Sequence, residues 1–198
     1  MTALLLVQMS GAPGAGKSTV ARAIGRRTGA AVLDHDVTKS ALLEAGVAAA
    51  VAGQASYQML LALGRSLLDQ GISVVLDSPC YYQELLDAGL HMAAETNACY
   101  RYVECATEDL VELSRRLRDR PPLRSQVLDL AATSARSTSG ETLSGEELFR
   151  EWIRNMKRPA HSYLRVDTSR PLGDCLPAVF AFLTECGRGR AAHEPAFQ

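Results

Sequence analysis

The sequence has little net charge, few lysines and no long apolar run. Its 198 residues include 21 basic and 22 acidic side chains, for a formal net charge of −1. Proteins that hold nucleic acid or an anionic membrane through a broad positive field need a clear excess of basic residues. The apolar stretch over residues 3–9 is too short to span a bilayer, and it lacks the basic flank and cleavage site of a signal peptide. We therefore expect a cytoplasmic protein that binds neither nucleic acid nor membrane.

Cysteine is present without the spacing that would give it a structural role. The five cysteines are odd in number and form no C-x-x-C pair, which argues against a zinc site and a disulfide framework and favours buried thiols in a reducing compartment. The remaining composition, 47% hydrophobic and 22% charged, is typical of a soluble globular protein. We expect one domain over residues 1–187 and a loose tail over 188–198. No oligomeric state is indicated.

Short apolar runs alternate with helical patterns along the chain. The runs lie at residues 3–9, 31–33, 72–76, 99–104 and 162–166, and the helical patterns at 17–27, 37–45, 54–69, 82–96, 108–117, 145–156 and 174–184. This alternation predicts an α/β fold of three layers, with a five-stranded parallel sheet flanked by helices. Because ligands of such sheets bind beyond the carboxyl ends of the strands, we expect the chemistry near Ser10, Asp34 and Asp77.

The stretch GAPGAGKS follows the first apolar run and precedes the first helical pattern. It fits the pattern G-x-x-x-x-G-K-[ST] of a phosphate-binding loop, in which glycines let backbone N–H groups surround a polyphosphate at the start of a helix. Lys17 would reach the β- and γ-phosphates, and Ser18 would be a ligand of Mg²⁺. A glycine-rich turn without a ligand is the alternative. The predicted nucleotide-binding residues of this stretch are Gly11, Ala12, Pro13, Gly14, Ala15, Gly16, Lys17, Ser18 and Thr19.

The stretch DHDVTK follows the second predicted strand and begins a helix. Asp36 and Lys39 are three residues apart and share one helix face. There Asp36 could accept a hydroxyl proton and Lys39 could hold a polar substrate, although an aspartate before a helix is also a common cap. We expect Asp34 beside the substrate or in a structural role, and His35 to point away from it.

The third predicted strand ends in Asp77, followed by SPCYY. An acidic residue at this place can position Mg²⁺ together with Ser18, and it can border the substrate. A turn or cap role is the alternative. Tyr57, Tyr81 and Tyr82 are candidates for the wall of a substrate pocket, although each tyrosine alone could equally belong to the core or the surface.

An arginine group straddles the end of a predicted helix and a Pro-Pro break. A lid over about residues 118–143 would carry part of it, because guanidinium groups suit the charge on a transferring phosphoryl group. We expect two or three of these arginines to reach the phosphates and the others to face water. The group consists of Arg115, Arg116, Arg118, Arg120 and Arg124. The nucleotide-binding candidates among them are Arg116, Arg120 and Arg124, and Arg120 is also a catalytic candidate.

The stretch GAPGAGKSTVARAIGRRTGAAVLDHD, followed by SVVLD, resembles the P-loop kinase superfamily. Within it, the sequence is similar to the group of zeta toxins, polynucleotide 5′-kinases and chloramphenicol phosphotransferase. The resemblance implies that Asp36 is the catalytic base, that Lys39 is the basic residue three positions later, and that an arginine-bearing lid follows the fourth strand. The stretch YLRVDTSRPL resembles the last strand and the loop beside the adenine. The Pro-rich lid sequence DRPPLRS departs from the pattern.

This resemblance implies an ATP- and Mg²⁺-dependent phosphotransferase with an alcohol group as acceptor. Asp36 would activate a hydroxyl of a small molecule, either a sugar, a nucleoside or a hydroxylated antibiotic. A polynucleotide 5′-hydroxyl kinase is the nearest alternative, although the near-neutral charge gives little sign of a nucleic-acid track. A nucleotide-dependent regulatory protein without an acceptor is the second alternative, and a base at position 36 argues against it.

Overall fold

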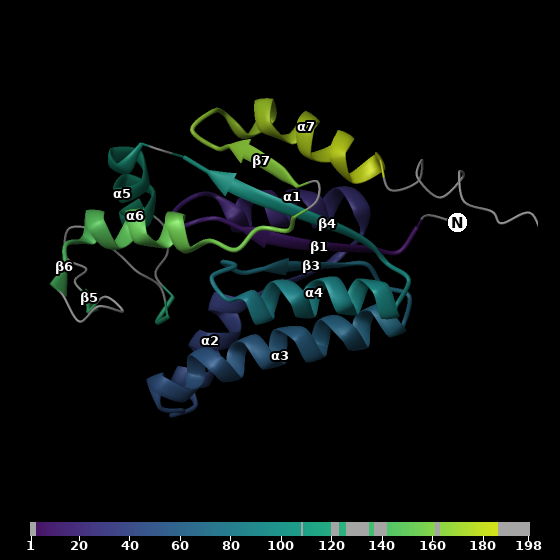
Figure 1. Ribbon diagram of the computed structural model, residues 1–198, viewed down its shortest axis with the longest axis horizontal. Helices are drawn as coiled ribbons and strands as arrows, with labels where there is room; N and C mark the ends of the chain where they lie inside the picture. Colours follow the sequence, from purple (N-terminus) through teal and green to yellow (C-terminus); the bar gives the residue numbers. More distant parts are fainter. Residues whose placement is uncertain are drawn as a thin grey trace, which may run out of the picture.

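A five-stranded sheet forms the centre of the protein in a computed structural model, which describes residues 3–107, 109–119, 123–125, 135–136, 142–160 and 163–185 (Figure 1). All its strands run parallel, in the order β2-β3-β1-β4-β7. Their carboxyl ends therefore meet at one edge. The bounds are β1 (Leu5–Ser10), β2 (Ala31–Asp34), β3 (Val74–Asp77), β4 (Cys99–Ala106) and β7 (Leu164–Asp167).

Helices cover both faces of this sheet and its carboxyl edge. Helices α3 and α4 lie side by side on one face, and α1 and α7 pack on the other, while α2, α5 and α6 lie toward the edge where the strands end (Figure 1). The predicted α/β fold with a five-stranded parallel sheet is therefore confirmed. The helices are α1 (Lys17–Thr28), α2 (His35–Glu44), α3 (Ala49–Asp69), α4 (Gln83–Glu95), α5 (Leu110–Asp119), α6 (Gly145–Asn155) and α7 (Leu172–Thr184).

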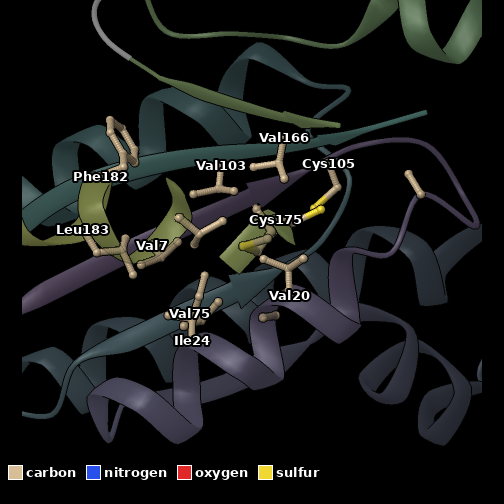
Figure 2. Close-up of a cluster of buried hydrophobic side chains, with 14 of the residues drawn as sticks. Val7, Val20, Ile24, Val75, Val103, Cys105, Val166, Cys175, Phe182 and Leu183 are labelled. Carbon is tan, nitrogen blue, oxygen red and sulfur yellow. The ribbon is translucent and has the colours of Figure 1, made fainter. Parts of the chain in front are cut away.

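The central strand divides its side chains between two cores, because successive residues of a strand point to opposite faces. Leu5, Val7 and Met9 pack toward α1 and α7, whereas Leu6 packs toward α3 and α4. Burial on both sides explains the continuous apolar run of β1, as is usual for parallel sheets. Figure 2 shows the first core, in which strand residues Val7, Val75, Val103 and Val166 meet Val20, Ile24, Phe182 and Leu183 from the helices.

Some element boundaries differ from the sequence-based expectation. Helix α2 begins at His35 rather than at 37, because the Asp34 carboxylate accepts the backbone N–H groups of Asp36 and Val37 and so starts the helix two residues earlier. Helix α3 begins at Ala49 rather than at 54, through an alanine-rich segment with high helix propensity.

A short hairpin within the predicted lid was not anticipated. It pairs β5 (Ala135–Arg136) with β6 (Thr142–Leu143) in antiparallel register. Strands of two residues carry no hydrophobic period from which to predict them. Most of the expected lid over 118–143, including Arg120, and the expected tail over 188–198 lie outside the described residues, so these two predictions stay predictions.

The cysteines match the expectation only in part. Cys80, Cys105 and Cys175 are free and buried, as predicted, whereas Cys99 is disulfide-bonded, which an odd cysteine count without a C-x-x-C pair did not indicate. Across the described ranges, no helix combines the length and apolar character needed to cross a bilayer.

Candidate functional site

A cavity of about 1440 Å³ opens at the carboxyl edge of the sheet. The loop between β1 and α1 and the end of α5 form one part of its lining, and α2, α3, the β3–α4 connection and α6 form the rest. Single ligand pockets are commonly 300–1,000 Å³. The cavity is therefore large enough for a nucleotide and a second molecule.

The loop between β1 and α1 depends on glycine at two positions. Gly11 has φ of 133°, and a Cβ placed there would lie 2.2 Å from the carbonyl oxygen of Cys105 on β4. Gly16 has φ of 83° and is the N-cap of α1. Only glycine takes these conformations without strain. The loop thus passes close to the sheet and delivers its backbone N–H groups to the positive end of a helix, where anions bind.

Lys17 is the first residue of α1 and lines the cavity. Its Nζ donates to the carbonyl oxygens of Gly11 at 2.8 Å and Ala12 at 3.0 Å. These contacts hold the ammonium group inside the curve of the loop. Pro13, Gly14, Gly16, Ser18 and Thr19 also line this cavity, whereas Gly11, Ala12 and Ala15 border a smaller one of about 200 Å³ behind the loop.

Asp77 lies at the end of β3, opposite Asp34 in the register of β2 and β3. Its side chain is buried, with the residue 3% exposed. Burial, together with the nearby Asp34 charge, raises the pKa of the Asp77 carboxyl to about 6, although Lys17 and Ser18 act to lower it. Its Oδ2 is buried without a hydrogen-bond partner. The Asp77 carboxylate is thus held in an environment that suits a cation.

Asp34 is occupied mainly by the start of α2. Its Oδ1 accepts from the backbone N–H of Asp36 at 2.9 Å and of Val37 at 3.3 Å, and its Oδ2 lies 3.8 Å from a guanidinium nitrogen of Arg22. The residue also lines the cavity. As the N-cap, Asp34 determines where α2 begins and therefore where Asp36 points.

Asp36 and Lys39 both line the cavity from α2. The Asp36 side chain is 37% exposed, so its carboxylate can reach a bound molecule. The Ser125 hydroxyl donates to the Asp36 backbone carbonyl at 3.0 Å and lies 3.4 Å from the Asp36 Oδ1, and the Ser125 backbone N–H donates to the Ser40 hydroxyl at 3.1 Å. Ser125 lies three residues after the Pro-Pro break, and no sequence signal pointed to this contact.

His35 lies inside the site, contrary to the sequence-based expectation. The residue is 5% exposed and lines the cavity. Its ring stacks on Tyr57 of α3 at a centroid distance of 4.0 Å, and its Nε2 lies 2.8 Å from the Ser56 hydroxyl. The expectation was wrong because it placed the helix start at 37 and so did not turn the His35 side chain toward α3.

Aromatic side chains from three elements line the part of the cavity away from the loop. Tyr57 meets Tyr82 edge to face at 5.8 Å, and Tyr81 lies 6.5 Å from the ring of Trp152 on α6. Burial raises the pKa of Tyr81, and the Asp36 charge raises it further, which places the phenol near that carboxylate. The Tyr81 hydroxyl is buried without a hydrogen-bond partner. Trp152 was not predicted; it follows the Ser144–Glu147 capping box by two turns.

The arginine group divides between the cavity and other contacts. Arg115 and Arg116 line the cavity, where both bind Glu112, and Arg116 also donates to the carbonyl of Thr168 after β7. Arg124 donates to the Leu43 carbonyl at 3.0 Å near the end of α2 and is not among the cavity-lining residues. Arg118 is exposed, and Arg120 lies outside the described residues.

The chain matches the family described as the AAA domain over residues 6–136, which is more than half of its length, and it belongs to that family. The matched stretch contains the glycine loop, Asp36 and Asp77. In sequence, the chain is 31% identical over 119 residues to the uncharacterised proteins Rv2004c of Mycobacterium tuberculosis and Mb2027c of Mycobacterium bovis. That alignment covers 54% of this chain and 24% of each relative, so the chain spans about a quarter of the length of these curated relatives.

Three solved structures with the same fold are kinases by name. A sugar kinase from Janibacter sp. HTCC2649 has a TM-score of 0.62 at 14% identity, covering 91% of this chain and 95% of that one. A gluconokinase from Sinorhizobium meliloti has a TM-score of 0.62 at 16% identity, covering 98% and 100%. The APS kinase of Mycobacterium tuberculosis, solved with AMPPNP and APS, has a TM-score of 0.63 at 22% identity, covering 93% and 99%. The predicted resemblance to P-loop kinases is thus confirmed in the fold.

Proposed function

We propose that the protein is an ATP- and Mg²⁺-dependent kinase that transfers the γ-phosphoryl group to a hydroxyl of a small molecule. The acceptor would be a sugar, a nucleoside or a hydroxylated antibiotic, bound within one domain over residues 1–187. The observation that carries this proposal is that a glycine loop with Lys17 and an accessible Asp36 carboxylate open into one cavity. Phosphoryl transfer requires positioning and charge stabilisation more than covalent chemistry.

The side chains at the loop fit a magnesium ion. The Ser18 hydroxyl lies close enough to the Asp77 carboxyl to lower its pKa, and the Asp77 Oδ2 is buried without a hydrogen-bond partner. Mg²⁺ prefers oxygen ligands and is commonly held by one or two carboxylates plus phosphates and water. When bound, it would neutralise charge on the β- and γ-phosphates. Ser18 and Asp77 would hold it there, and the Lys17 ammonium would turn from the loop carbonyls to the phosphate oxygens.

The other residues position and activate the acceptor. Asp36 would accept the hydroxyl proton, and Lys39 on the same side of α2 would hold a polar group of the acceptor. Tyr57 and Tyr81 would form its wall. Arg116, at the cavity, is a candidate for contact with the nucleotide, and Arg120 and Arg124 would reach it only if the lid over about 118–143 closes.

Steady-state assays with the full chain test this proposal. ADP formation from ATP and Mg²⁺ is measured without acceptor, with an oligonucleotide that carries a 5′-hydroxyl, and with a panel of sugars, nucleosides and hydroxylated antibiotics. We expect at least one small molecule to increase ADP formation and to appear as a phosphate ester by phosphorus NMR. The Lys17→Ala variant provides the background.

Two outcomes would replace the proposal. Equal ADP formation under every condition would favour a nucleotide-dependent regulatory protein without an acceptor. Transfer to the oligonucleotide alone would favour a polynucleotide 5′-hydroxyl kinase.

A further inference from the structure

We propose that His35 is a positioning residue that takes over the proton which Asp36 removes from the acceptor hydroxyl. The inference rests on the proposed kinase function, and it assigns a role to a buried side chain that this function alone does not use. It is carried by three contacts of one imidazole ring, with Ser56, Tyr57 and Asp36.

The contact with Ser56 determines which ring nitrogen carries the proton. The Ser56 hydroxyl donates its only hydrogen to the carbonyl oxygen of Gly53 at 2.7 Å, and its oxygen lies 2.8 Å from the His35 Nε2. A carbonyl can only accept, and a hydroxyl has one proton. The His35 Nε2 therefore donates to Ser56, and in the neutral ring the Nδ1 carries the lone pair.

That Nδ1 faces the proposed base. It is buried without a hydrogen-bond partner and lies 3.7 Å from the Oδ1 of Asp36. A lone pair beside a carboxylate is unfavourable until a proton lies between them. The gap is about 1 Å longer than a hydrogen bond and would close by a small rotation of the partly exposed Asp36 side chain, as catalytic contacts often do when substrate binds.

The surroundings keep the ring in this orientation. Tyr57 stacks on one face of His35 with an interplanar angle of 27°, and Tyr82 packs against the edge of Tyr57. The titratable and charged groups around the ring are Asp34 and Asp36 at the start of α2, and Tyr57 with Tyr82 behind it. A ring held by a stack and a hydrogen bond keeps its Nδ1 directed at Asp36.

Asp36, His35 and water together account for the proton that the acceptor hydroxyl loses. As the acceptor oxygen bonds to the γ-phosphorus and the bond from the γ-phosphorus to the β,γ-bridging oxygen breaks, the hydroxyl O–H bond breaks and its proton goes to Asp36. The proton then moves to the His35 Nδ1, which gives an imidazolium that donates to Asp36 and to Ser56. It leaves to water when the products depart, and the pair returns to carboxylate and neutral imidazole.

Two substitutions separate basicity from hydrogen bonding. His35→Gln keeps a polar group near the Nε2 position, and His35→Asn keeps one near the Nδ1 position, but neither amide is basic. We expect both to lower kcat by roughly 10- to 100-fold with little change in KM. We also expect the acidic limb of the pH profile of kcat to move to lower pH in both, because imidazoles in general bind a proton at higher pH than carboxylates and both variants lack the imidazole. His91→Asn, at an exposed histidine of α4 that does not line the cavity, is the matched control and should equal the wild type.

Two kinetic outcomes would contradict this role of His35. Wild-type kcat in His35→Asn would mean that a donor at this position suffices, and an effect on KM alone would mean that His35 only lines the pocket. Either result overturns the inference and leaves the kinase proposal intact.

A second measurement does not depend on activity. Nitrogen NMR of the histidine rings in the full chain at neutral pH should show His35 with its proton on Nε2, and Ser56→Ala should disturb that assignment. Finding the proton on Nδ1 would overturn the inference even if no acceptor were ever phosphorylated, whereas failure of the whole acceptor panel would affect only the proposed function.

Discussion

The two sides of the cavity are built in different ways. The side at the phosphate loop is, apart from the end of α5, one continuous stretch of backbone between β1 and α1, shaped by Gly11 against β4 and by Gly16 at the start of α1. The rest of the lining is made of side chains from α2, α3, the β3–α4 connection and α6, which are far apart in the sequence. A backbone loop recognises a group that all nucleoside triphosphates share, whereas a wall of separate side chains can change one residue at a time. Specificity for the acceptor should therefore depend on the second side.

The largest effect is expected at the loop, from Lys17→Ala. A single positive charge at a transferring phosphoryl group is worth roughly 10³–10⁵ in kcat, and Lys17 supplies it at the start of α1. We expect the fold to survive, because the Nζ donates to two carbonyl oxygens of its own loop. Turnover and circular dichroism are compared with Lys157→Ala, a lysine that does not line the cavity. Near-wild-type turnover in Lys17→Ala would remove the basis for the nucleotide site.

The next effect distinguishes the acceptor side from the loop side. Asp36→Asn keeps the shape of the base and removes its basicity, so turnover should fall by roughly 10²–10⁴-fold while ATP affinity changes little. Asp34→Asn should slow turnover much less, because asparagine also caps a helix and the start of α2 is kept. Turnover and nucleotide binding of both variants are measured with the same acceptor. The opposite order of effects would make Asp34 the base, and no effect in either would favour the regulatory alternative.

The contrast between a contiguous backbone loop and side chains from separate elements also explains which parts of the site could be predicted from the sequence. The glycine loop is contiguous, so its pattern predicted its position, and the apolar runs predicted all five strands of the sheet. The signal is strongest in β1 and β3, which are buried throughout, whereas the edge strands β2 and β7 are only partly buried. Ser125, Trp152 and the orientation of His35 were not predicted. Their positions arise from tertiary contacts, of His35 with α3, of Ser125 with α2 and of Trp152 with Tyr81 and the first core, and such contacts leave no local pattern. The strands and the phosphate loop could thus be predicted from local sequence patterns, whereas the side chains proposed to contact the acceptor could not.

A smaller effect, opposite in sign for stability and activity, is expected at Asp77. Its carboxyl has a pKa raised to about 6 from the ordinary 3.8, so the folded protein without Mg²⁺ favours the protonated form, and stability falls as the pH rises from about 4 to about 6. Asp77→Asn should therefore have a free energy of unfolding at pH 8 that is higher than that of the wild type by up to about 3 kcal/mol, measured by denaturant unfolding. The same variant should lose turnover.

The pH series contains the control for this effect. Near pH 3.5 the Asp77 carboxyl is neutral in the folded state and mostly neutral in the unfolded state, so the stability difference between wild type and Asp77→Asn should nearly disappear there. A difference that stays constant from pH 3.5 to pH 8 would mean that packing, rather than the buried charge, separates the two proteins.

The smallest effect is expected at the aromatic wall, from Trp152→Ala. Its ring lies 6.5 Å from that of Tyr81 and lines the cavity from α6, and an aromatic contact is worth about 0.5–1.5 kcal/mol beyond its buried area. KM for the acceptor should rise by roughly 3- to 10-fold, while KM for ATP and kcat with saturating acceptor stay close to wild type, because an indole ring adds contact area and takes no part in proton transfer. Trp152→Phe should restore most of the loss, because it keeps an aromatic face. If KM for ATP rises instead, Trp152 contacts the nucleotide rather than the acceptor, and α6 belongs with the phosphate loop.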